Sequence, residues 1–202
     1  MSTANASAKR HSILPPISQS GPKPPVTFSS SITISDGAVL TGTNPITISS
    51  ESVIHPRARI DSMGGTITIG RRCIVHERTK IGHMGSEGRI SLAEGNKAVM
   101  MEDYVTVEVA AVVEPGGTVL GEGTVVGVGS RIGRGAVVGK YCTITPQSEV
   151  PEGARIPDFT VVYGNGMTRQ DRRGVSALMN NAQKQHIAVL RRLIPSKPEK
   201  FH

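Results

Sequence analysis

Branched apolar residues recur every six positions along most of this chain. The clearest run comprises Leu120, Val126, Ile132, Val138, Ile144, Val150, Ile156 and Val162. The fourth residue after each of these, up to Ile156, is small: Thr124, Ser130, Ala136, Cys142, Ser148, Ala154 and Thr160. A period of six fits neither an α-helix, with about 3.6 residues per turn, nor a simple alternating hairpin. The pattern therefore predicts a repeat architecture.

The same spacing continues upstream in shorter runs. These runs comprise Ile34 and Leu40, then Ile48, Ile54 and Ile60, then Ile69, Val75 and Ile81, then Met101, Val107 and Val113. Each hexad predicts a short strand and then a corner, with the branched residue pointing inward and the small residue near the corner. Gly often follows the branched residue directly, as at Gly70 and Gly121. We expect these glycines to relieve the backbone where the chain turns.

Three such hexads would close one triangular coil. The pattern thus resembles the left-handed parallel β-helix of hexapeptide-repeat proteins, and it predicts an all-β solenoid over residues 31–165 with a C-terminal α-helix. Left-handed crossovers are exceptions to the usual right-handed rule, and the length of the repeat supports the exception here. A β-sandwich with accidental spacing is the alternative.

The two ends differ from the body in composition. Residues 1–30 are rich in Ser and Pro and predict a disordered arm. Residues 166–195 predict an amphipathic helix that Pro195 ends, followed by a tail over 196–202. Its apolar face comprises Val175, Leu178, Met179, Ala182, His186, Val189, Leu190 and Leu193. A helix of this length needs support, so the face is expected to dock on the solenoid wall, with a partner protein as the other possibility.

Charge and composition exclude several functional classes. The formal net charge is +7, but the basic residues gather at the two ends and the body is nearly neutral. A nucleic-acid-binding body would carry a basic stripe interleaved with aromatic residues, so we expect no nucleic acid partner. No apolar run approaches the length of a membrane span, and the amino terminus lacks a hydrophobic signal stretch. These features predict an intracellular protein, without direct membrane insertion.

Two cysteines within the hexad repeat, and one interruption of that repeat, lead to further predictions. Cys73 and Cys142 both occupy the small inward position, which predicts neither a disulfide nor a catalytic thiol. The interruption, residues 82–97, predicts a loop at a corner, with residues 89–92 as a strand at an edge. Insertions of this kind are common binding sites in solenoids.

The hexapeptide architecture has two enzymatic uses, and both need imidazoles. Acyltransferases of this kind use a His as general base, and gamma-class carbonic anhydrases hold zinc with three His residues from neighbouring subunits. His76 and His83 are the best metal pair here, but no His lies between His83 and His186. Glu108 and Glu114 could replace a general base, although nothing in the sequence orients them as a pair. We therefore expect no catalytic, cofactor-binding or metal-binding residue and no enzyme, with a carbonic-anhydrase-like zinc enzyme and an acyltransferase as alternatives.

Several segments together carry a more specific resemblance. They are Val53-Ile54-His55-Pro56-Arg57-Ala58-Arg59-Ile60, the coil at Ile69-Gly70, the segment Thr160-Val161-Val162-Tyr163-Gly164, and the basic helix leading to Leu193-Ile194-Pro195. In this order, over residues 32–195, the chain resembles the dynactin subunit 6 family. The loop over residues 82–97 and the coil between Leu40 and Ile48 depart from the family pattern.

The resemblance implies a role in assembly. It implies a non-catalytic scaffold subunit in the pointed-end complex of dynactin, the activator of cytoplasmic dynein. The implied partners are dynactin subunit 5, which would form a heterodimer with this chain, dynactin subunit 4 and the pointed-end actin-related protein. The implied role is support of dynein-dependent cargo transport along microtubules, and the implied location is the cytoplasm and the cytoskeleton.

Overall fold

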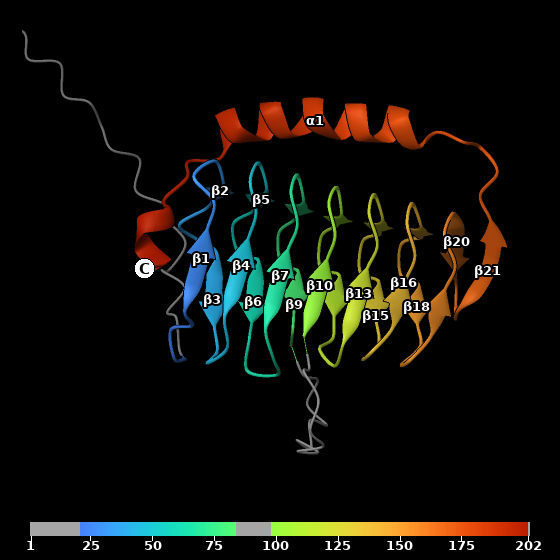
Figure 1. Ribbon diagram of the computed structural model, residues 1–202, viewed down its shortest axis with the longest axis horizontal. Coiled ribbons are helices and arrows are strands. Elements are labelled where there is room, and N and C mark those ends of the chain that lie inside the picture. Colours follow the sequence, from blue (N-terminus) through green and yellow to red (C-terminus); the bar gives the residue numbers. More distant parts are fainter. Residues whose placement is uncertain (1–20, 84–97, 202) are drawn as a thin grey trace, which may run out of the picture.

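The protein is a triangular solenoid with one helix along its side (Figure 1). The computed structural model describes residues 21–83 and 98–201. The first twenty residues of the predicted arm, and most of the predicted loop with its edge strand at 89–92, lie outside the described residues. Within the described part, every strand pairing of the solenoid is parallel except that of the last two strands.

Three sheets form the sides of the triangle. The first contains β1 (Val26–Phe28), β4 (Ile46–Ile48), β7 (Ile67–Ile69), β10 (Val99–Met101), β13 (Thr118–Leu120), β16 (Val137–Val138) and β19 (Arg155–Ile156). The second contains β2 (Thr33–Ile34), β5 (Val53–Ile54), β8 (Ile74–Val75), β11 (Thr106–Val107), β14 (Val125–Val126), β17 (Thr143–Ile144), β20 (Thr160–Tyr163) and β21 (Met167–Gln170). The third contains β3 (Val39–Thr41), β6 (Arg59–Asp61), β9 (Lys80–Ile81), β12 (Val112–Val113), β15 (Arg131–Ile132) and β18 (Glu149–Val150).

The predicted inward positions form the core. Parallel register places each branched residue on its counterpart in the next coil, as Ile48 pairs with Ile69 and Leu120 with Val138. All of the small positions of the long run except Ala154 are also buried, and their hydroxyl groups form hydrogen bonds. Ser130 Oγ donates to the Thr145 carbonyl at 2.8 Å, and Thr124 Oγ1 donates to the Gly139 carbonyl at 2.8 Å. Small hydroxyl residues fit here because they reach the backbone of the next coil without leaving a buried polar group unpaired.

The corners correct our expectation about glycine. Positive φ occurs at the third residue after the branched one, for example at Arg57 (62°), Arg78 (59°) and Gly129 (65°). Gly82, which follows Ile81, meets the expectation with a φ of 74°, but Gly70 and Gly121 have no positive φ and serve another purpose. A Cβ added at Gly121 would lie 2.5 Å from the Gly139 carbonyl carbon in the next coil. That glycine therefore allows neighbouring coils to approach closely, rather than relieving a turn.

The end boundaries also differ from the prediction. β1 lies inside the range predicted as a disordered arm and pairs with β4, so the solenoid begins before residue 31. After β20 the chain first forms β21, antiparallel to β20, and only then α1 (Ser176–Leu193). The predicted tail holds a short 3-10 helix, Pro198–Phe201. The structure describes no helix that is long and apolar enough to cross a membrane.

The C-terminal part of the chain covers both ends of the solenoid. β21 pairs with the outer edge of β20 at one end. At the other, the Lys197 amide donates to the Ile34 carbonyl at 2.9 Å, and Phe201 is buried against Phe28 with ring centroids 6.4 Å apart. Uncovered strand edges and end coils invite pairing with other chains. In this protein the C-terminal segments cover the edges of the second sheet at both ends.

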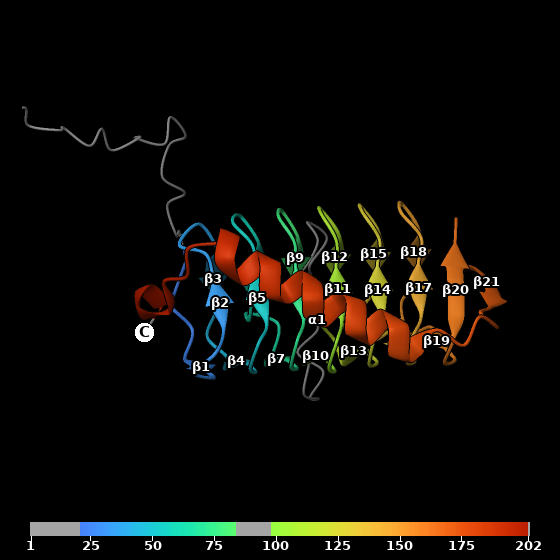
Figure 2. The same ribbon diagram turned by 90° about the horizontal axis from the view of Figure 1, so that it is seen from above.

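α1 returns along the second sheet, from the β20 end to the β2 end (Figure 2). Its most buried residue is Ile187, which packs on Val53 and Ile74 with Leu190 and Ile194 beside it. Docking on the wall is therefore present, but the docked face overlaps the predicted one only in part, through Leu190. The predicted stripe omitted Ile187, and three of its members point away from the solenoid: Leu178, Val189 and Leu193, with exposed fractions of 69%, 54% and 71%.

The two cysteines are buried and unpaired, as expected. Burial raises the pKa of Cys73 to about 12 and also raises the pKa of Cys142. Both thiols therefore stay protonated at neutral pH and act as small core groups.

Candidate functional site

Three imidazoles gather at one edge of α1. His55 follows β5, His76 follows β8 in the next coil, and His186 lies on the helix. The ring centroids of His55 and His76 are 4.6 Å apart, and those of His76 and His186 are 6.3 Å apart. The solenoid register places the first two rings side by side in consecutive coils, tilted by 33°, and the returning helix adds the third. We call these three residues the histidine cluster.

Burial and mutual repulsion favour the uncharged form of two members of this cluster, His55 and His76. Burial lowers the pKa of His55 to about 4, and the neighbouring His76 lowers it further against the opposing effect of Glu77. Burial also lowers the pKa of His76, with His186 acting in the same direction and Glu108 opposing. Neighbouring imidazoles disfavour one another's charged form. At neutral pH His55 and His76 are neutral bases.

The predicted zinc pair is not part of this cluster. His83 is exposed after β9 on the third sheet, whereas His76 follows β8 on the second sheet and its ring neighbours are His55 and His186. In residues 21–83 and 98–201, no three His, Cys, Asp or Glu side chains come together as a metal site. The Nε2 atom of His55 is buried and has no hydrogen-bond partner. Within these described residues, the histidine cluster therefore places three imidazoles together without a carboxylate or thiol that would complete a metal site.

The two candidate replacement bases have structural contacts. Glu108 Oε2 accepts from the Val128 amide at 3.0 Å. Glu114 Oε1 pairs with Arg131 Nη2 at 2.7 Å. They follow β11 and β12, which belong to different sheets. The structure therefore does not place Glu108 and Glu114 as an acid–base pair.

A polar seam holds the opposite edge of α1. Gln183 Nε2 donates to the Arg72 carbonyl at 2.8 Å, and Asn180 Nδ2 donates to Tyr141 Oη at 3.0 Å. Lys184 Nζ lies 5.8 Å from the centre of the Tyr104 ring. With the histidine cluster on one side and this seam on the other, the rotation of the helix about its own axis is fixed.

That rotation leaves apolar surface exposed. Leu178, Val189 and Leu193 form a row on the outer side of α1, and we call it the outer row. A second exposed pair, Val109 and Val128, occupies equivalent corners of successive coils, with exposed fractions of 38% and 43%. Single exposed apolar residues are common, but an aligned row on a docked helix is typical of an interaction surface.

Comparison with solved structures identifies the architecture. A Bacillus cereus protein assigned provisionally as an acetyltransferase is 20% identical, with 84% of this chain and 91% of that chain covered and a TM-score of 0.65. A hexapeptide transferase family protein from Anaplasma phagocytophilum is 17% identical, with 83% and 91% covered and a TM-score of 0.67. The fold is therefore the left-handed parallel β-helix of hexapeptide-repeat proteins, as the sequence predicted. No protein-family model matches the chain, and no curated protein matches its sequence.

The same comparison corrects the expectation that the chain is not an enzyme. Both of these structures carry the name of a transferase. That expectation rested on the absence of imidazoles placed close together. The histidine cluster shows that three imidazoles do lie together in the folded chain. From the sequence we considered His76 only with His83, as a metal pair, and His186 only as a member of the apolar face of the helix. One signal was present: His55 and His76 each directly follow a branched residue of the second sheet in consecutive coils.

Proposed function

We propose that this chain is an assembly subunit of the dynactin pointed-end type, pairing its β-helix with a second β-helix subunit. The proposed partners are dynactin subunit 5 in a heterodimer, dynactin subunit 4 and the pointed-end actin-related protein. The proposed setting is the cytoplasm, in dynein-dependent transport along microtubules. The observation that carries the proposal is the outer row of α1, because it is apolar surface that the solenoid leaves uncovered.

The way the ends are covered supports a lateral contact. β21 covers the second-sheet edge of the last coil, and the segment around Phe201 packs against the first coil. These contacts favour a partner on the sides of the solenoid or on the outer surface of α1 over one that stacks coil on coil. Apolar side chains at the centre of such a contact supply most of its binding energy.

The experiment is co-expression of the full chain with dynactin subunit 5, followed by size-exclusion chromatography with mass measurement. We expect a one-to-one complex. The triple variant Leu178→Glu, Val189→Glu and Leu193→Glu should lose it, because three buried carboxylates would be unpaired in the interface. The matched control is Ala177→Glu, Asn181→Glu and Ala188→Glu, which adds the same charge to exposed positions elsewhere on the same helix.

Two results would contradict the proposal. One is a wild-type chain that stays separate from dynactin subunit 5 in co-expression. The other is loss of the complex in both triple variants to the same extent, because the cause would then be added charge and not the outer row. Circular dichroism of both variants checks that α1 remains folded.

Acyl transfer is a second candidate, favoured by the fold shared with proteins named as transferases. In this reading a neutral imidazole of the histidine cluster, His76, would accept the proton of the acceptor group during acyl transfer. His76 is the member that lies between the other two rings, and Glu108 favours its charged form.

Calorimetric titration with coenzyme A tests this second candidate. Saturable binding, together with acetyl transfer that His76→Gln abolishes, would support it. A chain that binds no coenzyme A at millimolar concentration would exclude it. A complex with dynactin subunit 5 would leave this result unaffected, so the two candidates are tested separately.

A further inference from the structure

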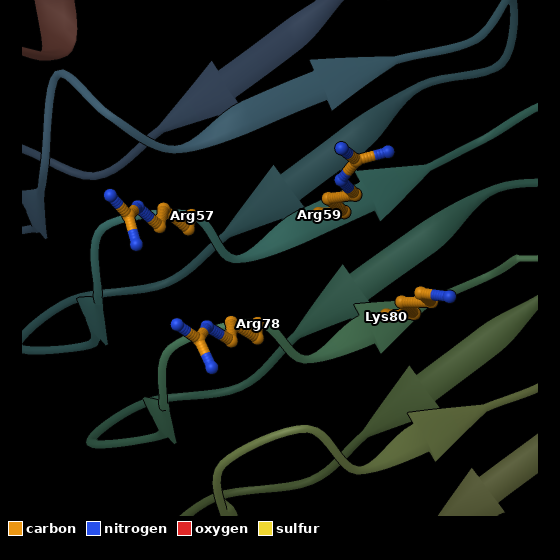
Figure 3. A pocket seen from close by; sticks show the side chains of 4 residues that line it. All are labelled: Arg57, Arg59, Arg78 and Lys80. Carbon is orange, nitrogen blue, oxygen red and sulfur yellow. The ribbon is translucent and has the colours of Figure 1, made fainter. Parts of the chain in front are cut away.

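Four cationic side chains line one hollow on the third sheet. They are Arg57, Arg59, Arg78 and Lys80, and the hollow has a volume of about 330 Å³ (Figure 3). Arg57 and Arg78 occupy the same corner position in consecutive coils, and Arg59 pairs directly with Lys80 across β6 and β9. The result is a two-by-two arrangement of positive charge, which we call the cationic square.

Among the described residues, the cationic square has no acidic partner in an ion pair. No ion pair within residues 21–83 and 98–201 involves any of its four members. Like charges directly opposite one another on neighbouring strands destabilise a sheet. The repulsion among the four cations is reduced when an anion binds between them.

Further along the same sheet, a cationic side chain is neutralised by ion pairs with acids of the neighbouring coils. Arg131 on β15 lies between two acids: its Nη2 is 2.7 Å from Glu114 Oε1 and its Nη1 is 3.1 Å from Glu149 Oε1. Charges there alternate in sign from coil to coil and neutralise one another. At the cationic square they repeat with the same sign. The contrast points to a ligand that supplies the missing negative charge.

The shape of the cationic square indicates a compact anion. The coil before it has Gly37 and Val39 at the two equivalent positions, and the coil after it has Ala110 and Val112. The charge is therefore two coils wide and stops at uncharged residues on both sides. An extended acidic peptide would meet only one or two of these cations along its length. Guanidinium groups bind phosphate oxygens in pairs, so three arginines and a lysine suit a small group with several phosphate oxygens.

We propose that the cationic square binds the diphosphate group of a small soluble ligand. The ligand's two phosphates would lie between the Arg57 and Arg78 guanidinium groups at the corner and the Arg59 and Lys80 side chains on the strands. The site is separate from the outer row of α1, so it stands whether or not the proposed pairing occurs.

The test is calorimetric titration of the full chain with inorganic pyrophosphate at low salt, with ADP as a second probe. We expect one binding site for pyrophosphate, and weaker binding as salt rises. ADP binding with similar affinity would identify a nucleotide as the source of the diphosphate, and pyrophosphate binding without ADP binding would identify the inorganic ion. Either result supports the site.

Variants distinguish binding at the cationic square from a general effect of the positive charge of the protein. The double variant Arg78→Gln and Lys80→Gln should weaken pyrophosphate binding about tenfold or more, since two charge-assisted contacts are lost. The control Arg155→Gln and Arg169→Gln removes the same charge at exposed positions outside the hollow and should bind within about twofold of wild type. Arg59→Gln alone gives a second measurement if the double variant folds poorly.

Three outcomes would overturn the proposal. They are no saturable binding of pyrophosphate, equal weakening in the double variant and its control, and binding of a poly-glutamate peptide that pyrophosphate does not displace. The last would assign the cationic square to an acidic protein partner instead.

Discussion

The coils of residues 46–81 and those of residues 118–162 share one kind of interior but differ at their corners. In the earlier coils the positive-φ positions carry charged side chains, namely Glu51, Arg57, Arg72 and Arg78. In the later coils many of them are glycine, namely Gly123, Gly129, Gly135 and Gly153. A left-handed conformation costs a residue with a side chain about 1–2 kcal/mol, and glycine avoids that cost.

Several of the side chains at positive-φ corners form hydrogen bonds that glycine could not form. Arg72 bonds Glu51 and Tyr104, and Tyr141 in the later coils bonds Glu122 and Asn180. Arg57 and Arg78 are exceptions, because they form no ion pair in the part of the chain that the structure describes. A strained corner residue without a partner is the kind of position where an external ligand is expected.

The largest expected effect tests whether the two interiors are equivalent. Ile60→Ala and Ile132→Ala each remove a fully buried side chain from the stack. Each should lower the free energy of unfolding by about 2–5 kcal/mol, because the neighbouring coils cannot collapse into the cavity. Urea unfolding followed by circular dichroism measures both. A small loss for only one of them would show that the two halves are packed differently.

The second largest effect distinguishes two roles of glycine. One is to let neighbouring coils approach closely, and the other is to avoid strain at a left-handed corner. A Cβ at Gly127 would lie 2.6 Å from the Ile144 carbonyl oxygen, whereas one at Gly153 meets nothing within 4 Å. Gly127→Ala should cost about 1–3 kcal/mol through overpacking. Gly153→Ala should cost only the left-handed strain, about 1 kcal/mol. Thermal unfolding compares the two, and an equal loss would contradict the distinction between these glycine positions.

A pH effect should belong to the earlier coils alone. Burial lowers the pKa of His55 from 6.5 to about 4, so the unfolded chain takes up a proton before the folded chain does. Stability should therefore fall as the pH drops from about 6.5 to about 4, by about 1–2 kcal/mol after solvent screening of this half-buried group. Urea unfolding at a series of pH values measures it. His55→Gln should flatten the profile over this range, and an unchanged profile would assign the effect to another group.

The smallest effects concern two corner arginines. Arg78→Gly should leave stability within about 0.5 kcal/mol of wild type or raise it, because left-handed strain and repulsion within the cationic square are both relieved. Arg72→Gly should lower it by about 1 kcal/mol, because the bonds to Glu51 and Tyr104 are lost. Differential scanning calorimetry of the pair measures the contrast. Identical behaviour would remove the distinction between corner side chains with and without partners.

The interior was predictable from the sequence and the surface was predictable only in part. Ile132 and Ser130 lie where the period places them, because each coil packs on a copy of itself. Ile187 was missed, because a helical pattern with apolar residues on several sides does not show which side meets the wall. Phe201 was missed for a related reason: nothing in a short C-terminal segment indicates the open coil that it covers.

The sequence alone determined the solenoid, its inward residues and its buried thiols, because these depend on a local period that neighbouring coils share. The tertiary structure decided everything that depends on the return of α1. It joined Ser196 to Ile34 across 162 residues, brought His186 to His76 and turned the outer row toward solvent. Such contacts follow no period, since one long helix crosses many coils and its position is set by the few side chains that fit together.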